Sequence, residues 1–270
     1  MNAAEPADQS ADILVITGLT MELEWFAHAF GVDFQRVARE GTSYLRGVHR
    51  MGDREISIVA VRQLGKGLTS AAVTTTKAIC LWRPSVVVMT GICAGVQNSV
   101  QLGDLVVATQ CFEHASGQLV GGEIIPLQNR IALEPWLLDY LMSISESDGC
   151  ATGIQAGYPG VLTEDFAMRV HYGSMACGPL VVKDSDYVAT LRSREHSLLA
   201  LDMESYGVAL AASMCSTPAR AVHAVVVKGV VDYADNSKTT TGTITRLMPV
   251  PLSPGTSLTR PLSAQLLSQR

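Results

Sequence analysis

Residues 221–235 read Ala221-Val-His-Ala-Val-Val-Val-Lys-Gly-Val-Val-Asp232-Tyr-Ala-Asp235, and this stretch decides the fold. Its long run of apolar, β-branched residues is typical of a strand buried on both faces of a helix-covered sheet. In open α/β sheets, ligands bind beyond the carboxyl ends of the strands, where this run delivers Asp232. Asp232 is therefore a candidate for proton chemistry in a partly dry site, and the alternative is that it only caps the following turn.

Apolar strands alternate with helical segments along most of the chain, which predicts one α/β domain with a mostly parallel central sheet wrapped by helices. We expect strands at 13–18, 43–48, 55–61, 84–91, from 103 onward, at 172–177 and at 221–232, and helices from Thr20 (its N-cap), at 65–82, 135–145 and 184–193, and after Glu204. The small residues 91–95 predict a loop after the 84–91 strand.

The domain boundaries follow from composition. Residues 1–11 are polar and acidic and predict a disordered arm, and residues 12–238 form the domain. From 239 to 270 the pattern breaks into a Thr/Pro-rich tail, where prolines at 249, 251 and 254 oppose a regular helix.

Composition argues against several classes of protein. The 270 residues carry a net charge of −5, and their 20 Lys and Arg residues are scattered, so we expect no nucleic-acid partner. No apolar run is long enough to span a bilayer, and the N-terminus lacks the basic region of a secretory signal, so we expect a cytoplasmic protein with no membrane partner. The six cysteines form no CxxC pair and predict small buried hydrophobes in a reducing compartment.

Metal and cofactor chemistry has no support in the sequence. The six histidines are dispersed without ligand spacing, so we expect neither a metal nor a cofactor. Cys93 could be a nucleophile, but no histidine lies near it in sequence, and a buried thiol is the favoured interpretation.

Three acidic residues stand where strands give way to loops or helices: Glu22, Glu204 and Asp232. Each of the two glutamates could simply favour a helix dipole. Together the three place carboxylates on one rim of the sheet, which suits cleavage of a glycosidic bond: one acid protonates the leaving group and another activates water. A third carboxylate can hold sugar hydroxyls by accepting two hydrogen bonds.

Five segments in this order resemble the nucleoside phosphorylase/nucleosidase superfamily, and within it the methylthioadenosine/S-adenosylhomocysteine nucleosidase-like branch. They are Thr17-Gly-Leu-Thr-Met-Glu22-Leu-Glu, Gly65-Lys-Gly, Thr90-Gly-Ile-Cys-Ala-Gly95 with Gly103-Asp-Leu-Val-Val, Asp202-Met203-Glu204, and Lys228-Gly-Val-Val-Asp232-Tyr-Ala-Asp. The resemblance implies a single nucleoside phosphorylase-like domain, with three α/β/α layers and a mixed, mostly parallel sheet that partly closes into a barrel. It also implies a homodimer.

The resemblance also implies roles for individual residues. Asp232 would protonate N7 of the purine, and Glu22 would position and deprotonate the attacking water. Glu204 would bind the ribose 2′- and 3′-hydroxyls, and Met203 would pack on the nucleoside unless it is a core residue. The backbone near Val182 would face the base edge, and Ile92 and Cys93, in the small-residue segment, would contact the substrate.

Water is favoured over phosphate as the nucleophile. Phosphorylases of this superfamily place an arginine shortly before the small-residue segment, where this chain has Met89. The acidic segment after the first strand would also repel phosphate. The predicted function is hydrolysis of a 5′-substituted adenosine to adenine and a free ribose derivative.

Three alternatives remain open: a nucleosidase for AMP-type or ATP-type nucleotides, a purine nucleoside phosphorylase, and a non-catalytic module that senses a nucleoside. A 5′-phosphate would need basic residues, and Arg46, Arg50, Arg62 and Arg169 are available. Val231 favours the sensor, because nucleosidases of this type commonly carry a hydroxyl or small residue before the acid. The tail favours the sensor as well, because it replaces the helix with which the family ends.

Overall fold

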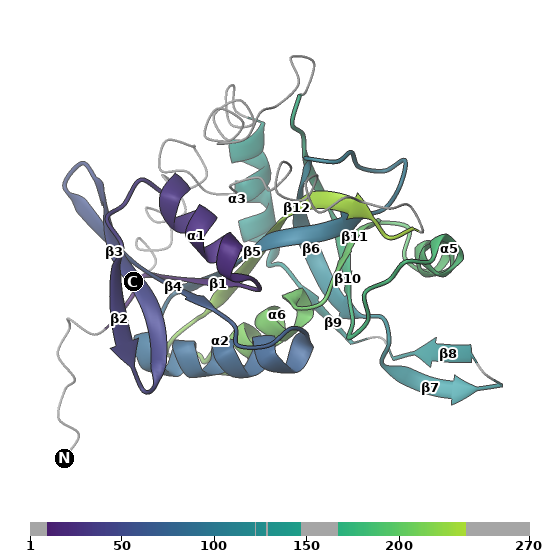
Figure 1. The fold of residues 1–270 in the computed structure, drawn as a ribbon, viewed down its shortest axis with the longest axis horizontal. Helices are drawn as coiled ribbons and strands as arrows, with labels where there is room; N and C mark the ends of the chain where they lie inside the picture. The colour runs from purple at the N-terminus through teal and green to yellow at the C-terminus, as the bar shows by residue number, and fades with distance from the viewer. Residues whose placement is uncertain (1–9, 122, 128, 147–166, 236–270) are drawn as a thin grey trace.

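The computed structural model describes residues 10–121, 123–127, 129–146 and 167–235, and the predicted tail at 239–270 lies outside them. One large mixed sheet runs through the described part (Figure 1). Its strands are β1 (Ile13–Thr17), β2 (Gln35–Arg39), β3 (Thr42–Met51), β4 (Arg54–Arg62), β5 (Val86–Gly95), β6 (Leu105–Glu113), β9 (Arg130–Ala132), β10 (Val170–Cys177), β11 (Leu198–Asp202) and β12 (His223–Tyr233).

The long apolar strand is central to this sheet. The strand order is β11-β10-β6-β12-β5-β1-β4-β3-β2, so β12 lies between β6 and β5. It runs parallel to β5 and antiparallel to β6. A further antiparallel pairing of β11 with β5 closes one part of the sheet into a barrel, as predicted, because β11 also pairs with β10.

Helices cover both faces of the sheet, which gives the three predicted layers. The helices are α1 (Thr20–Ala29), α2 (Leu68–Trp82), α3 (Pro135–Ser145), α5 (Ser185–Arg194) and α6 (Ser205–Cys215). Figure 1 shows α1 and α3 on one side and α2 and α6 on the other. Alternation along β1 explains the two cores, since Leu14 and Ile16 pack with α2 and α6 whereas Val15 packs with α1 and α3.

Most predicted elements are confirmed, including the α3 bounds, α5 after Asp184, and the β3–β4 hairpin, whose turn places Gly52 at a φ of 58°. Two local predictions are wrong. Residues 91–95 are not a loop, because β5 continues to Gly95 and pairs there with β12 and β11. Thr20 is not the N-cap of α1; Leu19 holds that position.

The N-terminal boundary also differs from the prediction. Ala11 was expected in the disordered arm, but it is buried and its N–H donates to the Trp82 carbonyl at 2.8 Å. The fold therefore includes Ala11, and residues 1–9 of the predicted arm lie outside the described part of the chain.

A small hairpin of β7 (Gly117–Val120) and β8 (Glu123–Pro126) forms a second sheet that projects from the body in Figure 1. Within the described residues, no helix has the length and apolar character needed to cross a membrane.

Candidate active site

A cavity of about 370 Å³ opens at the carboxyl ends of β5, β11 and β12. It brings together all seven residues singled out in the sequence: Glu22, Ile92, Cys93, Val182, Met203, Glu204 and Asp232. Its other lining residues are Gly18, Leu19, Lys66, Ala94, His114, Leu180, Val181, Lys183, Leu201, Asp202, Val231, Tyr233 and Asp235. The roles given to the seven residues remain predictions, but their shared location is a property of the fold.

Glu22 is held in place by backbone N–H groups from two elements. Its Oε2 accepts from Gly18 at 2.7 Å and Leu19 at 2.8 Å, and its Oε1 accepts from Ile92 at 3.0 Å. An ionised carboxylate offers about four acceptor sites, so three bonds leave one site, on Oε1. Burial raises the pKa of Glu22 above its ordinary value, while Lys228 and the three N–H groups act in the opposite direction.

Gly91 makes room for that carboxylate. A Cβ at this position would lie 2.4 Å from Glu22 Oε1, a separation that real Cβ atoms do not show. The glycine therefore lets β5 approach α1 closely enough for Ile92 to donate to Glu22.

Glu204 is the N-cap residue of α6, and its carboxylate is held by two hydrogen-bond donors. Its Oε1 accepts from the Gln63 side chain at 3.1 Å and from the Gly67 N–H at 3.0 Å. Oε2 has no hydrogen-bond partner among the described residues, so it can accept from a bound ligand.

A β-bulge in β12 lies directly before Asp232. In the pairing of β12 with β5, Val230 lies opposite Cys93 and Asp232 opposite Ala94, so Val231 is the extra residue. Bulges of this kind re-aim a side chain near a site. Val231 is buried, and burial raises the pKa of Asp232; Lys183 lowers it and Asp235 raises it further.

Lys228 is a charged residue beside the cavity to which the sequence assigned no role. It is 1% exposed and its Nζ lies 3.2 Å from Asp202 Oδ2. Burial alone would lower the pKa of Lys228, but Asp202, Glu22 and Glu204 together raise it above its ordinary value. A single lysine inside an otherwise apolar strand was the available signal, because a buried ammonium requires acidic partners.

Asp202 is tied down from several directions. It accepts from the Cys177 thiol at 2.9 Å, from the Ser205 N–H at 3.1 Å and from the Ser205 hydroxyl. Asp202 also lines the cavity, and its ion pair with Lys228 fixes the position of the ammonium.

Two lysines, Lys66 and Lys183, line the cavity. Lys66 precedes Gly67, which binds Glu204, whereas Lys183 acts on Asp232. The Asp184 N–H donates to the Ala234 carbonyl at 3.1 Å, which ties the segment after Lys183 to the end of β12. None of the four arginines considered for a 5′-phosphate lines this cavity.

Cys93 and His114 are buried walls of the cavity. Burial raises the pKa of the Cys93 thiol, whose S–H donates to the Gly229 carbonyl at 3.5 Å, so this thiol is not a nucleophile. Burial lowers the pKa of His114, and its Nδ1 pairs with the Tyr187 hydroxyl at 2.8 Å. Within the described residues, no group of three or more His, Cys, Asp or Glu side chains could hold a metal.

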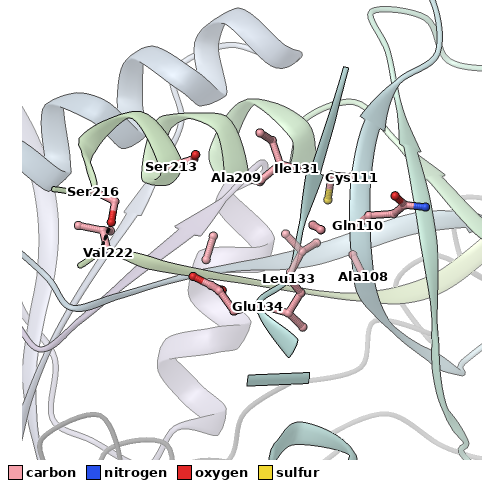
Figure 2. Close-up of a pocket in the computed structure, with 13 residues that line it drawn as sticks. Ala108, Gln110, Cys111, Ile131, Leu133, Glu134, Ala209, Ser213, Ser216 and Val222 are labelled. Atoms are coloured by element: carbon pink, nitrogen blue, oxygen red, sulfur yellow. Dashed lines mark hydrogen bonds between the residues drawn. The ribbon is translucent and has the colours of Figure 1, made fainter. Parts of the chain in front are cut away.

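A second cavity, of about 170 Å³, lies between α6 and strands β6, β9 and β12 (Figure 2). Figure 2 shows Glu134 at one wall and Ser213 and Ser216 on the α6 side. Glu134 already pairs with His223 at 2.9 Å, and Ser216 Oγ accepts from the Val222 N–H at 3.1 Å. This cavity contains none of the carboxylates of the first.

Comparison with known proteins places these features in a family. A family model described as the phosphorylase superfamily matches residues 12–246. The protein y4jS of Sinorhizobium fredii is 28% identical over 232 residues, covering 84% of this chain and 55% of that protein. The ATP nucleosidase Cap17 of Escherichia coli is 24% identical over 250 residues, covering 87% of this chain and 48% of that protein. This chain thus spans about half the length of these two curated relatives.

A solved structure shows the same fold. The 5′-methylthioadenosine/S-adenosylhomocysteine nucleosidase of Helicobacter pylori, bound to butyl-thio-DADMe-Immucillin-A, superposes with a TM-score of 0.65 at 21% identity. The match covers 96% of this chain and 97% of that one.

Replacing Lys183 tests the electrostatics of Asp232. Lys183→Met should raise the Asp232 pKa, because it removes the cation that opposes burial. The measurement is an NMR titration of ¹³C-labelled aspartate carboxyls, with Asp232→Asn to identify the signal. Lys66→Met is the matched control and should leave this pKa in place. An unchanged titration in Lys183→Met, or equal shifts in both variants, would contradict the assignment.

Proposed function

Since the chain belongs to the phosphorylase superfamily, we propose that it is a purine nucleosidase, an N-glycosyl hydrolase. Its substrate is a 5′-substituted adenosine of the methylthioadenosine/S-adenosylhomocysteine type, and its products are adenine and the free ribose derivative. One observation carries the proposal: a single cavity holds the N–H-bound Glu22, the anchored Glu204 and the half-buried Asp232.

Glu22 serves as the base. The site left on Oε1 accepts a hydrogen bond from one water molecule, and the three N–H bonds keep the carboxylate from turning away. Glu22 takes the proton of this water as its oxygen bonds to C1′ of the ribose. The developing positive charge on the ribosyl group is stabilised by the nearby carboxylates.

Asp232 serves as the acid. Its raised pKa favours the protonated form, which donates to N7 so that adenine leaves as a neutral base when the C1′–N9 bond breaks. Glu204 accepts from the 2′- and 3′-hydroxyls through Oε2 and holds the ribose between the two reacting groups. Met203 and Ile92 pack on the nucleoside, and the backbone at Val182 faces the edge of the base.

Water is the nucleophile because, among the described residues, no arginine lines the cavity to hold a phosphate nucleophile, and Met89 is buried in the core. The Gly18 and Leu19 N–H groups that could bind an anion already bind Glu22.

A nucleotide is the second candidate substrate, and Lys66 supports it. This exposed lysine sits in the loop that binds Glu204, so it lies at the ribose end of the cavity. An ammonium there can pair with a 5′-phosphate. The similarity to an ATP nucleosidase agrees with this alternative.

A homodimer in the cytoplasm completes the proposal. Leu180 and Val181 border the cavity and are 64% and 68% exposed, so a second subunit would bury apolar surface at the mouth.

Product analysis tests the reaction. Methylthioadenosine in phosphate-free buffer should yield adenine and free methylthioribose, with the same rate and products after phosphate is added, as measured by chromatography.

Glu22→Gln should lower kcat by about 10²–10⁴-fold because an amide cannot take the proton of water. Asp232→Asn should bind substrate but lose most of its turnover.

Glu24→Gln is the matched control for Glu22→Gln, since Glu24 lies on the same helix but is exposed, and it should keep wild-type turnover. A ribose 1-phosphate product would overturn hydrolysis. Absence of turnover with every adenosine derivative would favour the sensing module.

Comparison of substrates tests the nucleotide alternative. If a 5′-phosphate is bound, Lys66→Ala should raise KM for AMP or ATP about 10-fold and leave KM for methylthioadenosine unchanged. Steady-state kinetics with both substrates measures this. Equal effects on the two substrates would exclude Lys66 as a phosphate ligand.

A further inference from the structure

The N-terminal ends of helices α2 and α6 lie next to each other, and the two helices pack closely there. The Gly67 N–H, just before α2, donates to Glu204, just before α6. One turn further, a Cβ on Gly207 would lie 2.4 Å from the Leu68 carbonyl oxygen and 3.3 Å from the Ala71 Cβ. Only a glycine allows so close an approach, and Figure 1 shows the two helices side by side.

The far ends of these helices carry a pair of thiols. At 1.5 Å per residue, Cys80 lies about 13 Å along α2 from Ala71, and Cys215 lies about 12 Å along α6 from Gly207. The two cysteines therefore lie at about the same distance along the two helices from the point where the helices are in closest contact. Cys80 and Thr76 lie four residues apart on one face of α2, and both influence the pKa of the Cys215 thiol, so all three side chains are neighbours between the two helices.

These two thiols differ from the others that the structure describes. Cys80 is exposed and Cys215 is partly exposed, whereas Cys93, Cys111 and Cys177 are buried. The expectation that cysteines act as small buried hydrophobes is thus wrong for Cys80. The active-site chemistry uses neither Cys80 nor Cys215, and neither lines a cavity described above.

We propose that Cys80 and Cys215 are a redox-active dithiol that closes to a disulfide across α2 and α6. A small-molecule disulfide such as oxidised glutathione is the oxidant. The exposed Cys80 attacks one of its sulfurs as a thiolate and releases one glutathione thiol. Cys215 then attacks the mixed disulfide at Cys80 and releases the second thiol. Two protein thiols are oxidised, one disulfide is reduced, and the two protons end on glutathione.

The position of this bond gives it a structural consequence. It would join the C-terminal ends of the two helices whose N-cap residues, Gly67 and Glu204, are hydrogen-bonded to each other. It would also cross-link segments that are far apart in sequence, which restricts the unfolded chain and stabilises the folded one. In Figure 2, Ser213 and Ser216 mark the end of α6 at which Cys215 lies.

Differential labelling tests the proposal on the full chain. The native protein is incubated with oxidised glutathione, its remaining thiols are blocked in denaturant, and reduced disulfides receive a second label located by mass spectrometry. We expect the second label on Cys80 and Cys215 and an intact mass lower by two hydrogen atoms. The melting temperature should rise by about 5 °C or more and return after reduction.

Cys80→Ser and Cys215→Ser should each lose both the cross-link and the rise in melting temperature. Cys150→Ser, at a cysteine outside the described residues, should keep both. The proposal fails if Cys80 and Cys215 stay unmodified at excess oxidant, or if glutathione accumulates on each of them without a cross-link. It also fails if the second label appears on another pair of cysteines.

Discussion

A buried ammonium surrounded by carboxylates is the interaction on which the site depends. Lys228 lies in the most buried part of β12, next to Asp202 and within the field of Glu22 and Glu204. An unpaired charge at this depth would be strongly destabilising, so Lys228 requires its ion pair with Asp202, and Glu22 and Glu204 add to the stabilisation of the ammonium. Strand β12 therefore contributes both to the core and, through Lys228, to the electrostatic stabilisation of the acidic residues at one edge of the sheet.

This arrangement separates the acids into two kinds. Glu22 faces the ammonium and three N–H donors, all of which favour its ionised form against the effect of burial. The shifts at Asp232 come instead from burial and two groups at the mouth, Lys183 and Asp235. Lys228 is not among the groups that shift the pKa of Asp232, which follows the bulge at Val231. Burial raises the pKa of both carboxyls, and the three N–H bonds and the ammonium at Glu22 favour it as the base in the proposed hydrolysis, with Asp232 as the acid.

The pattern of side chains predicted most helices and strands and the acidic residues at one edge of the sheet, because buried strands and the starts of helices have local sequence signatures. Glu22, Glu204 and Asp232 were found as residues that follow apolar runs. Lys228, Lys66 and Lys183 were not, because their meaning depends on neighbours distant in sequence, such as the pairing of Lys228 with Asp202. The continuation of β5 through 91–95 was also missed, because its glycines resemble a loop until β11 and β12 pair with it. For the same reason, Cys80 and Cys215 gave no local signal of their contact.

The pH dependence of kcat/KM in Lys228→Met is the most direct measurement of whether this ion cluster keeps Glu22 ionised. Loss of the ammonium should move the acidic limb of the profile, which reports Glu22, to higher pH by about one unit or more. The alkaline limb, which reports Asp232, should stay in place, and Lys228→Arg should keep both limbs because it keeps the charge. An acidic limb that does not move in Lys228→Met, or a shift of both limbs together, would contradict the dependence of Glu22 on Lys228.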